Sequence, residues 1–161
     1  MADFTCNIAL GRAVELVNRV KTGDPAGSTL IVVALATSGL ESDAVLRDKD
    51  TLADLVSGTT NEVPVGNGYA RKSIVAADLN PVVPDDVNDR TDLDIPDQTW
   101  TQVLVASGQW SKLVICYKPA ASSTDAQIVP LTCHDFVIIP DGTDIVAQIS
   151  VTGFFRAAPL S

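Results

Sequence analysis

Apolar side chains in residues 7–21, NIALGRAVELVNRVK, return every three or four positions. That spacing places them along one stripe of a helix. Asn7 is a candidate N-cap, and the glycines and proline of residues 22–27, TGDPAG, are residues that stop helices. The pattern therefore predicts one helix at the start of the chain.

A continuous apolar run follows in residues 28–38, STLIVVALATS, where β-branched side chains are frequent. Such a run between turn residues is typical of a strand that is covered on both faces. A short helix is predicted next, in residues 51–58, with Thr51 as its N-cap, Asp54 at its third position and Gly58 as its stop.

The rest of the chain alternates between apolar runs and turn residues. In TTNEVPVGNGYARKSI, residues 59–74, the glycines of GNG allow positive φ and predict a turn that reverses the chain before a strand, which continues to residue 79. The strongest strand pattern is QWSKLVICYKP, residues 109–119. Another strand is predicted in AQIVPLTCHDFVII, where Pro130 indicates an edge or a bulge. After the turn PDG, residues 143–157 are predicted as one final strand.

These elements predict a mainly β protein: an antiparallel β-sandwich or barrel with an N-terminal helix and one short additional helix. The length of 161 residues favours a single domain over residues 1–161. Within it, residues 1–27 form a helical N-terminal segment, and residues 28–161 form a β-rich body. The body contains an Asp/Pro-rich loop at residues 80–98.

Composition and charge narrow the classes of partner. Apolar residues make up 46% of the chain and aromatic residues only 5%, so the core must consist mostly of Val, Ile, Leu and Ala. The net charge of −9 repels phosphate backbones and favours docking on a basic protein surface. We therefore expect no direct nucleic-acid binding. The start of the chain does not have the pattern of a signal peptide, and the longest apolar run, residues 30–36, is too short to span a bilayer. These features predict a cytoplasm-like compartment and no membrane contact.

The residues that usually carry catalysis are few. The chain has three cysteines without a CxxC pair, and its one histidine cannot complete a usual zinc site. Cys116 and Cys133 lie in apolar runs and are predicted to be buried free thiols. His134 follows Cys133 directly, but neighbours in a strand point to opposite faces, so a structural, hydrogen-bonded histidine is expected. We therefore predict that the protein is not an enzyme and has no cofactor, metal or catalytic residue.

Residues 80–98 carry six aspartates, three prolines and one arginine. Residues 86–97 fail as an EF-hand because Arg90 and Thr91 stand where a ligand and a glycine are needed. Two interpretations stay open: a solvated acidic loop, or an irregular cation site. Its candidate ligands are Asp85, Asp86, Asp89 and Asp92.

Two groups of aromatic residues have alternative interpretations. Trp100, Trp110 and Tyr117 are either core or interface anchors or a platform on which a ligand stacks. Phe154 and Phe155 are adjacent and cannot both face one side of a strand, so one of them, together with Arg156, is a candidate for partner contact.

Several short motifs follow a fixed order along the chain: Thr37 and Ser38 at the end of an apolar strand, NEV at 61–63, GNGY at 66–69 and VICYK at 114–118. This order resembles small structural proteins encoded in tailed-bacteriophage genomes. The similarity extends over residues 30–157, and the N-terminal segment and the Asp/Pro-rich loop depart from it.

The resemblance implies a non-enzymatic virion protein of the capsid decoration, or cement, type, which binds the outside of the shell and stabilises it. Its implied partners are the major capsid protein and further copies of the same chain. The implied location is the capsid surface of the virion, after synthesis in the host cytoplasm. Predicted partner contacts are the N-terminal segment, the loop at 85–97 and the residues Arg71, Lys72, Asp85, Asp86, Asp89, Phe155 and Arg156.

Two alternatives remain at this level. The first is a tail or neck component of the virion. The second is a ligand-binding β-sandwich module for host recognition, which requires an exposed aromatic platform around Trp100 or Trp110.

Overall fold

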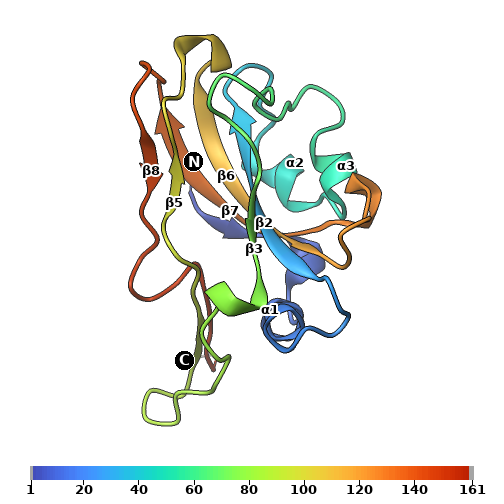
Figure 1. Cartoon of the computed structure of the whole chain (residues 1–161). Coiled ribbons are helices and arrows are strands. Elements are labelled where there is room, and N and C mark those ends of the chain that lie inside the picture. Colours follow the sequence, from blue (N-terminus) through green and yellow to red (C-terminus); the bar gives the residue numbers. More distant parts are fainter. Residues whose placement is uncertain (1, 160–161) are drawn as a thin grey trace.

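A five-stranded antiparallel sheet with the strand order β1-β7-β6-β2-β3 forms the centre of the protein. The computed structural model describes residues 2–159 (Figure 1). The strands of this sheet are β1 (Phe4–Thr5), β7 (Val129–Ile138), β6 (Trp110–Lys118), β2 (Thr29–Ala36) and β3 (Lys72–Ile74). Two separate two-stranded ribbons pair β4 (Thr91–Leu93) with β9 (Phe155–Ala157), and β5 (Gln98–Trp100) with β8 (Ile145–Ala147).

The two strongest strand predictions are confirmed and form the middle of the sheet. β2 and β6 pair from Thr29↔Lys118 to Ala36↔Trp110, and both are buried on both faces over most of their length. Their continuous apolar runs are explained by this position, because a central strand between two packed layers has no solvent-facing side.

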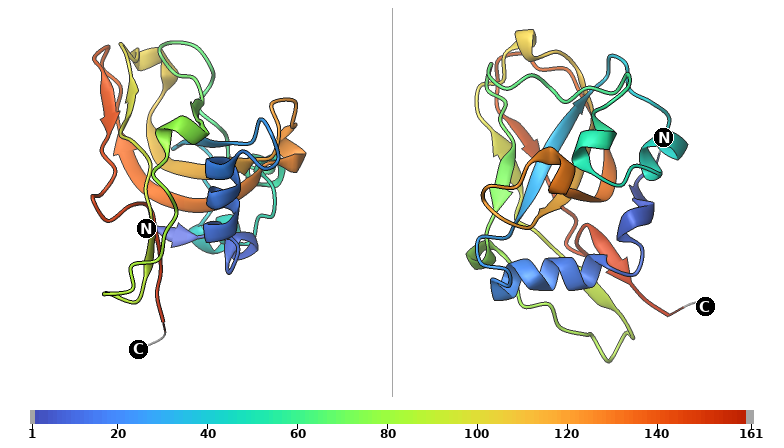
Figure 2. Two further views of the ribbon diagram at one scale, coloured as in Figure 1. Left: turned by 60° about the horizontal axis from the view of Figure 1, so that its bottom comes forward. Right: turned by 90° about the vertical axis from the view of Figure 1, so that its right-hand side faces the viewer.

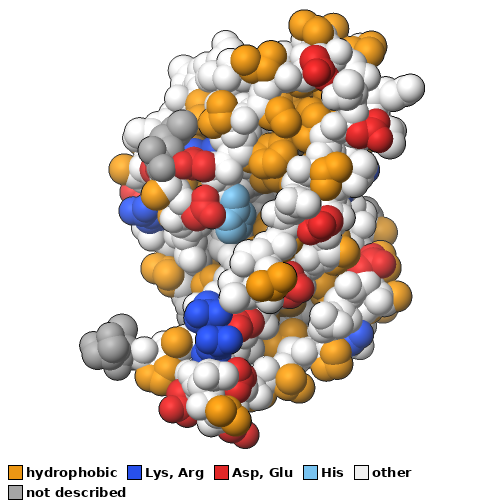
Figure 3. All heavy atoms as spheres, turned by 90° about the vertical axis from the view of Figure 1, so that its left-hand side faces the viewer, with side chains coloured by type: hydrophobic (Ala, Val, Ile, Leu, Met, Phe, Trp, Pro, Cys, Tyr) orange, Lys and Arg blue, Asp and Glu red, His pale blue; other side chains and the backbone are white. Residues whose placement is uncertain are grey.

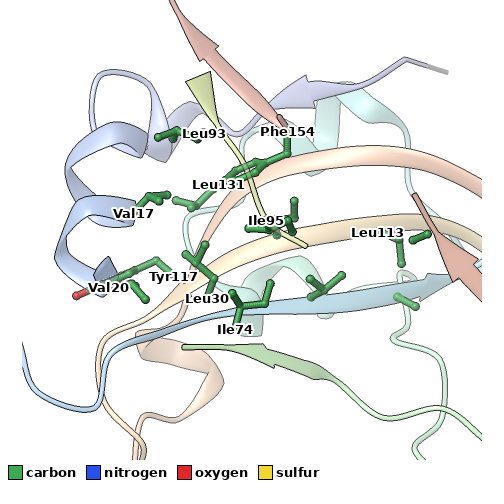
Figure 4. Close-up of a cluster of buried hydrophobic side chains, with 14 of the residues drawn as sticks. Val17, Val20, Leu30, Ile74, Leu93, Ile95, Leu113, Tyr117, Leu131 and Phe154 are labelled. Atoms are coloured by element: carbon green, nitrogen blue, oxygen red, sulfur yellow. The ribbon is translucent and has the colours of Figure 1, made fainter. Parts of the chain in front are cut away.

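Each face of the sheet has its own hydrophobic core. On one face, α2 (Asp43–Arg47) and α3 (Leu52–Leu55) pack with Leu46, Leu52 and Leu55 against the inward side chains of β2 and β6. On the other face lie α1 (Ala13–Thr22) and the two ribbons, as Figures 1 and 2 show. Figure 4 shows part of this second core, where Val17 and Val20 of α1 meet side chains of the sheet and of the ribbons. The result is a sandwich-like fold and not a closed barrel, which confirms the predicted fold class.

The N-terminal helix is confirmed, but its predicted start is wrong. The chain forms a 3₁₀ turn, η1 (Asn7–Ala9), and then reverses at Gly11, whose φ is +76°, so that α1 begins only at Ala13. Asn7 caps nothing; its side-chain amide donates a hydrogen bond to Asp48. The predicted stop is confirmed, because the helix ends at Thr22 and Gly23 adopts the left-handed conformation.

The predicted short helix is confirmed as α3, where the hydroxyl of Thr51 accepts a hydrogen bond from the backbone N–H of Asp54 at 3.0 Å. It ends at Leu55, before Gly58. The described chain contains a second short helix, α2, that the sequence reasoning missed. Its five residues are too few for apolar periodicity to reveal it.

Two predicted strands are shorter than expected. Of residues 69–79 only Lys72–Ile74 pair as a strand, and Ala76–Asp78 form the 3₁₀ turn η2. Residues 143–157 are not one strand, because a turn at residues 150–153 separates β8 from β9. β9 then pairs with β4, so the predicted Asp/Pro-rich loop contains a strand of its own.

The bulge predicted at Pro130 and the turns predicted at PDG and GNG are confirmed. At Pro130 the register between β6 and β7 shifts, which is the predicted bulge. In PDG, the carboxylate of Asp141 accepts hydrogen bonds from the backbone N–H and the hydroxyl of Thr143. In GNG, Gly66 and Tyr69 bond to each other across Asn67 and Gly68, as expected for a tight turn.

All three cysteines are free thiols buried in the core on the α2–α3 face, as predicted for Cys116 and Cys133. The sulfur atoms of Cys6 and Cys133 lie 4.0 Å apart and share a hydrogen bond. That bond and burial raise the pKa of Cys133, and burial raises the pKa of Cys116.

A cluster of three aromatic rings stands at the end of the second core. The rings of Trp100 and Trp110 meet edge to face with 5.2 Å between centroids, and Tyr69 meets Trp110 in the same way. Trp100 donates its indole N–H to the carbonyl oxygen of Ala70 at 2.8 Å. The indole N–H of Trp110 is buried and has no hydrogen-bond partner among residues 2–159.

This difference between the two indoles predicts unequal effects of the same substitution. Trp110→Phe is expected to cost about 1–2 kcal/mol less than Trp100→Phe, because it removes a buried donor that has no partner, whereas Trp100→Phe breaks a hydrogen bond. Both side chains are at most 1% exposed, so each substitution serves as the control for the other. Urea unfolding measures the difference, and an equal or larger cost at Trp110 would contradict the prediction.

Candidate functional site

A hollow of about 520 Å³ lies between strand β7 and the segment that follows β8; we call it the β7–β8 groove. Thr132, His134 and Phe136 of β7 line one wall, and residues 147–150 line the other. The floor is apolar and includes Leu113 and Ile115 of β6. In Figure 3 the histidine is visible in a hollow of this surface, with hydrophobic side chains next to it.

The groove exists because two strand edges face each other without pairing. β7 pairs with β1 only at Phe4↔Cys133 and Thr5↔Thr132, so its outer edge from residue 134 to residue 138 has no strand partner in the described chain. β8 pairs with β5 on one side and, within residues 2–159, with no strand on the other. The sandwich is open along this line.

His134 is held at the mouth of the groove by two hydrogen bonds, as a structural histidine was expected to be. Its Nδ1 lies 3.0 Å from the carboxylate of Asp3, and its Nε2 lies 2.8 Å from the hydroxyl of Thr132. The other oxygen of Asp3 accepts the backbone N–H of Asp135 at 2.8 Å. Burial raises the pKa of Asp3, but these hydrogen bonds outweigh it and hold the pKa below its usual value.

The order carboxylate, imidazole, hydroxyl is also that of a nucleophilic triad. Here the hydroxyl belongs to Thr132, which is 2% exposed, so a substrate carbonyl has no open approach to it. The contacts of Asp3 with His134 and with Asp135 instead fasten the start of the chain to β7. Geometry therefore supports a structural role for this group of side chains.

Behind the groove, on the opposite face of the sheet, Lys112 is completely buried between two carboxylates. Its ammonium lies 2.5 Å from Asp135 and 3.0 Å from Asp43 of α2. It also stands over the ring of Phe4 at 5.3 Å. Sequence reasoning missed this site, although a lysine inside the apolar run WSKLVICYK was a signal that a buried cation needs partners.

The structure places the predicted contact residues in three separate regions. Arg71 donates bidentate hydrogen bonds to both Glu62 and Asp125, which raise the pKa of Arg71. The ammonium of Lys72 lies 5.5 Å from the ring centroid of Trp100. Both side chains are engaged within the protein, so a partner at this place would compete with internal contacts.

The second region contains Asp85 and Arg156, which are far apart in the sequence and are connected through Arg90 and Asp92. Arg156 donates to Asp92 at 2.6 Å, and this bond lowers the pKa of Asp92. Arg90 lies 3.1 Å from Asp92 and 3.8 Å from Asp85. Arg156 thus joins the two strands of the β4–β9 ribbon, and Arg90 links this ribbon to the turn at residues 85–90.

Of the remaining predicted contacts, Asp86 and Asp89 belong to the second region, and Phe155 lies in the third region, the β7–β8 groove. Asp86 and Asp89 are exposed in the turn at residues 85–90. Phe154 is buried and Phe155 is half-buried, and both line the β7–β8 groove and pack with the second core. In the part of the chain that the structure describes, no group of three or more His, Cys, Asp or Glu side chains is arranged for a metal ion, so the acidic loop has no such ligand cluster.

The interpretation of the tryptophans as an exposed platform is wrong. Trp100 is 1% exposed and Trp110 is fully buried, and Tyr117 is also in the core. These rings are core anchors, because the low aromatic content leaves them as the largest side chains that can fill the interior.

One end of the molecule is built from three turns, and we call it the three-turn end: residues 64–69, 101–109 and 139–144. Backbone N–H groups tie the turns together, from Leu104 to Asn67 O at 2.9 Å and from Gly142 to Val103 O at 2.8 Å. The carboxylate of Asp144 accepts the N–H of Gln102 at 2.8 Å. The sequence predicted the turns GNG and PDG, but it did not show that they lie next to each other or next to residues 101–109.

Four large apolar side chains are exposed at the three-turn end: Val65, Leu104, Val105 and Ile139. Figure 3 shows hydrophobic side chains gathered at the upper end of the molecule, where the turn between β7 and β8 lies. A rigid end with several exposed apolar side chains is typical of a protein-binding surface.

The helices of residues 2–159 include none that is long and apolar enough to cross a membrane. No known protein family, curated protein or solved structure matches the chain.

Proposed function

We propose that the protein is a non-enzymatic virion structural protein that binds the outside of a phage capsid and stabilises the shell. The observation that carries this proposal is the three-turn end, with its exposed apolar side chains on hydrogen-bonded turns. The order of sequence motifs supplies the class of partner, and the three-turn end supplies a surface with which to bind it.

Rigidity matters because a loop that must become ordered on binding loses affinity. Gly66, Asn67, Gly68 and Gln102 all have positive φ. Backbone hydrogen bonds hold Gly66 and Asn67, and the carboxylate of Asp144 accepts the N–H of Gln102. A β-carbon on Gly68 would lie 2.7 Å from Val103 Cα, so the two turns are in direct contact. The surface is therefore already formed before a partner arrives.

The net charge of the chain and the many identical sites of a shell support the same class of partner. The net charge of −9 favours a basic protein surface and disfavours the packaged nucleic acid. A shell offers many identical sites, and linked copies of the protein would gain avidity from modest contacts at each site. The proposal includes association of this chain with further copies of itself on the shell.

The test uses purified shells that lack the protein. We expect the wild-type protein to bind them at saturable sites and to raise the temperature at which they break open. The triple variant Val65→Ser/Leu104→Ser/Val105→Ser is expected to bind at least about tenfold more weakly, because it loses apolar burial at each contact. All three side chains are exposed, so the fold is expected to persist.

A matched control removes three apolar side chains elsewhere, in Val45→Ser/Val75→Ser/Val151→Ser, which are exposed by 42%, 45% and 99%. This variant is expected to bind shells as the wild type does. The proposal fails if wild-type protein does not bind the shells, if bound protein leaves their stability unchanged, or if both triple variants bind equally well.

A further inference from the structure

We propose that the β7–β8 groove accepts an extended segment of a partner protein, which adds as a strand between β7 and β8 and carries basic residues beside its apolar ones. This inference rests on the proposed function, since the segment would belong to a shell protein. It adds a second mode of binding, through backbone hydrogen bonds, to the apolar contacts of the three-turn end.

The strands on the two sides of the groove, β7 and β8, each have an edge without a strand partner in the described chain. An unpaired strand edge presents backbone N–H and C=O groups that an added strand can satisfy. The wall at β7 is such an edge over residues 134–138, and the wall after β8 is formed by residues 147–150. A peptide backbone is the group that bonds both walls at once, whereas a compact small molecule could not repeat these contacts along the groove.

Beyond Asp135, the edge of β7 carries no protection against pairing. Proteins usually blunt an exposed edge with lysine, proline or a covering segment. Here the edge carries Val137, which is 64% exposed, and no proline or lysine occurs between Asp135 and Ile139. Pairing by β1 ends at Phe4, and beyond it the Asp3 side chain takes the N–H of Asp135.

The lining of the groove also determines which side chains the incoming strand would need. On one face they would meet Leu113, Ile115 and Phe136, so alternate apolar residues are required there. At the mouth stands Asp3, whose side chain is 62% exposed, on a chain with a net charge of −9. Arg156 also lines the groove, but its charge is already paired with Asp92. Lysine or arginine at the flanks of the segment would therefore be favoured over acidic residues.

The experiment uses the full chain labelled with ¹⁵N and a synthetic peptide of the sequence Lys-Val-Thr-Val-Thr-Val-Lys. We expect it to shift the amide signals of residues 134–138 and 147–150 in NMR spectra. The same peptide with proline at its centre, or with glutamate at both flanks, is expected to bind at least about tenfold more weakly.

Two variants of the protein complete the test. Val137→Lys places a charge on the edge at an exposed position and is expected to weaken peptide binding by about tenfold or more. Val87→Lys makes the same change at a side chain that is 91% exposed in the acidic turn, and it is expected to bind as the wild type does.

The inference is overturned if no peptide shifts the groove residues, if the proline peptide binds equally well, or if Val137→Lys binds both peptide and shells like the wild type. It is also overturned if Val137→Lys abolishes self-association of the chain, because a second copy would then occupy the groove. Shell binding that is lost in the three-turn variant and kept in Val137→Lys would leave the proposed function intact. Peptide binding without shell binding would remove the proposed function and keep the groove as a strand-binding site.

Discussion

Asp43→Asn/Asp135→Asn is expected to lower the free energy of unfolding by about 3 kcal/mol, because it leaves the buried ammonium of Lys112 without a charged partner. Asp43 and Asp135 are themselves 22% and 30% exposed, so solvent screens part of the effect. The triple variant Asp43→Asn/Lys112→Met/Asp135→Asn is expected to recover most of the loss, because no buried charge remains. Urea unfolding at neutral pH measures all three proteins.

The pH dependence of stability gives a second readout of the same site. Burial disfavours the charged form of Lys112, but hydrogen bonds from Lys112 to Asp135 and Asp43 outweigh it and raise its pKa. In the wild type this contribution is present below the unfolded value near 10.5 and is lost as the pH rises through the folded value.

In the double variant only burial acts on Lys112, so its folded pKa falls below the unfolded one. Stability is then expected to rise with pH below the unfolded value near 10.5, where the unfolded state binds more protons than the folded one. A double variant that is as stable as the wild type, or that loses stability over this range, would show that Lys112 is not held by these carboxylates.

Gly153→Ala is expected to destabilise the protein by about 3 kcal/mol or more. A β-carbon at this position would overlap the carbonyl oxygen of Leu93, so the backbone must move. The movement would break the hydrogen bond from Phe154 N–H to Leu93 O, which is 2.8 Å long and begins the β4–β9 ribbon.

Gly11→Ala is the matched control for this substitution. Gly11 has φ of +76° and Gly153 has φ of +78°, so both alanines suffer the same backbone strain of about 1 kcal/mol. A β-carbon on Gly11 meets nothing within 4 Å in the described chain. The difference between the two variants in thermal unfolding therefore isolates the close contact, and equal losses would show that the ribbon is not packed as described.

Local signals account for what the sequence predicted well. β2 and β6 are continuous apolar runs, and α3 has its cap within four residues, so neighbouring side chains alone define them. The start of α1 was missed because Ile8 and Ala9 fit the helical stripe, while the reversal at Gly11 is visible only in the backbone. The boundary between β8 and β9 depends on Leu93, which lies about sixty residues earlier in the chain.

The candidate sites depend even more on distant contacts. The β7–β8 groove exists because β1, from the start of the chain, covers only part of the β7 edge. The three-turn end requires Asn67, Leu104 and Gly142 to meet. Predicting either surface needs the strand order, which apolar spacing does not contain. Residue types were informative only for single features, such as the turn at Gly66 and Gly68.

All three cysteine thiols of the chain are buried, so a thiol reagent can be directed to one introduced cysteine. Maleimide reagents attack thiolates, and the two cysteines whose pKa is raised are also closed to solvent. A single cysteine introduced at Val75, which is 45% exposed and lies outside the three-turn end, would therefore react alone in the folded protein. A gold particle attached there would test the proposed location in electron micrographs of virions: label on the shell is the expected result, and label at the neck or tail, or on no part of the particle, would contradict it.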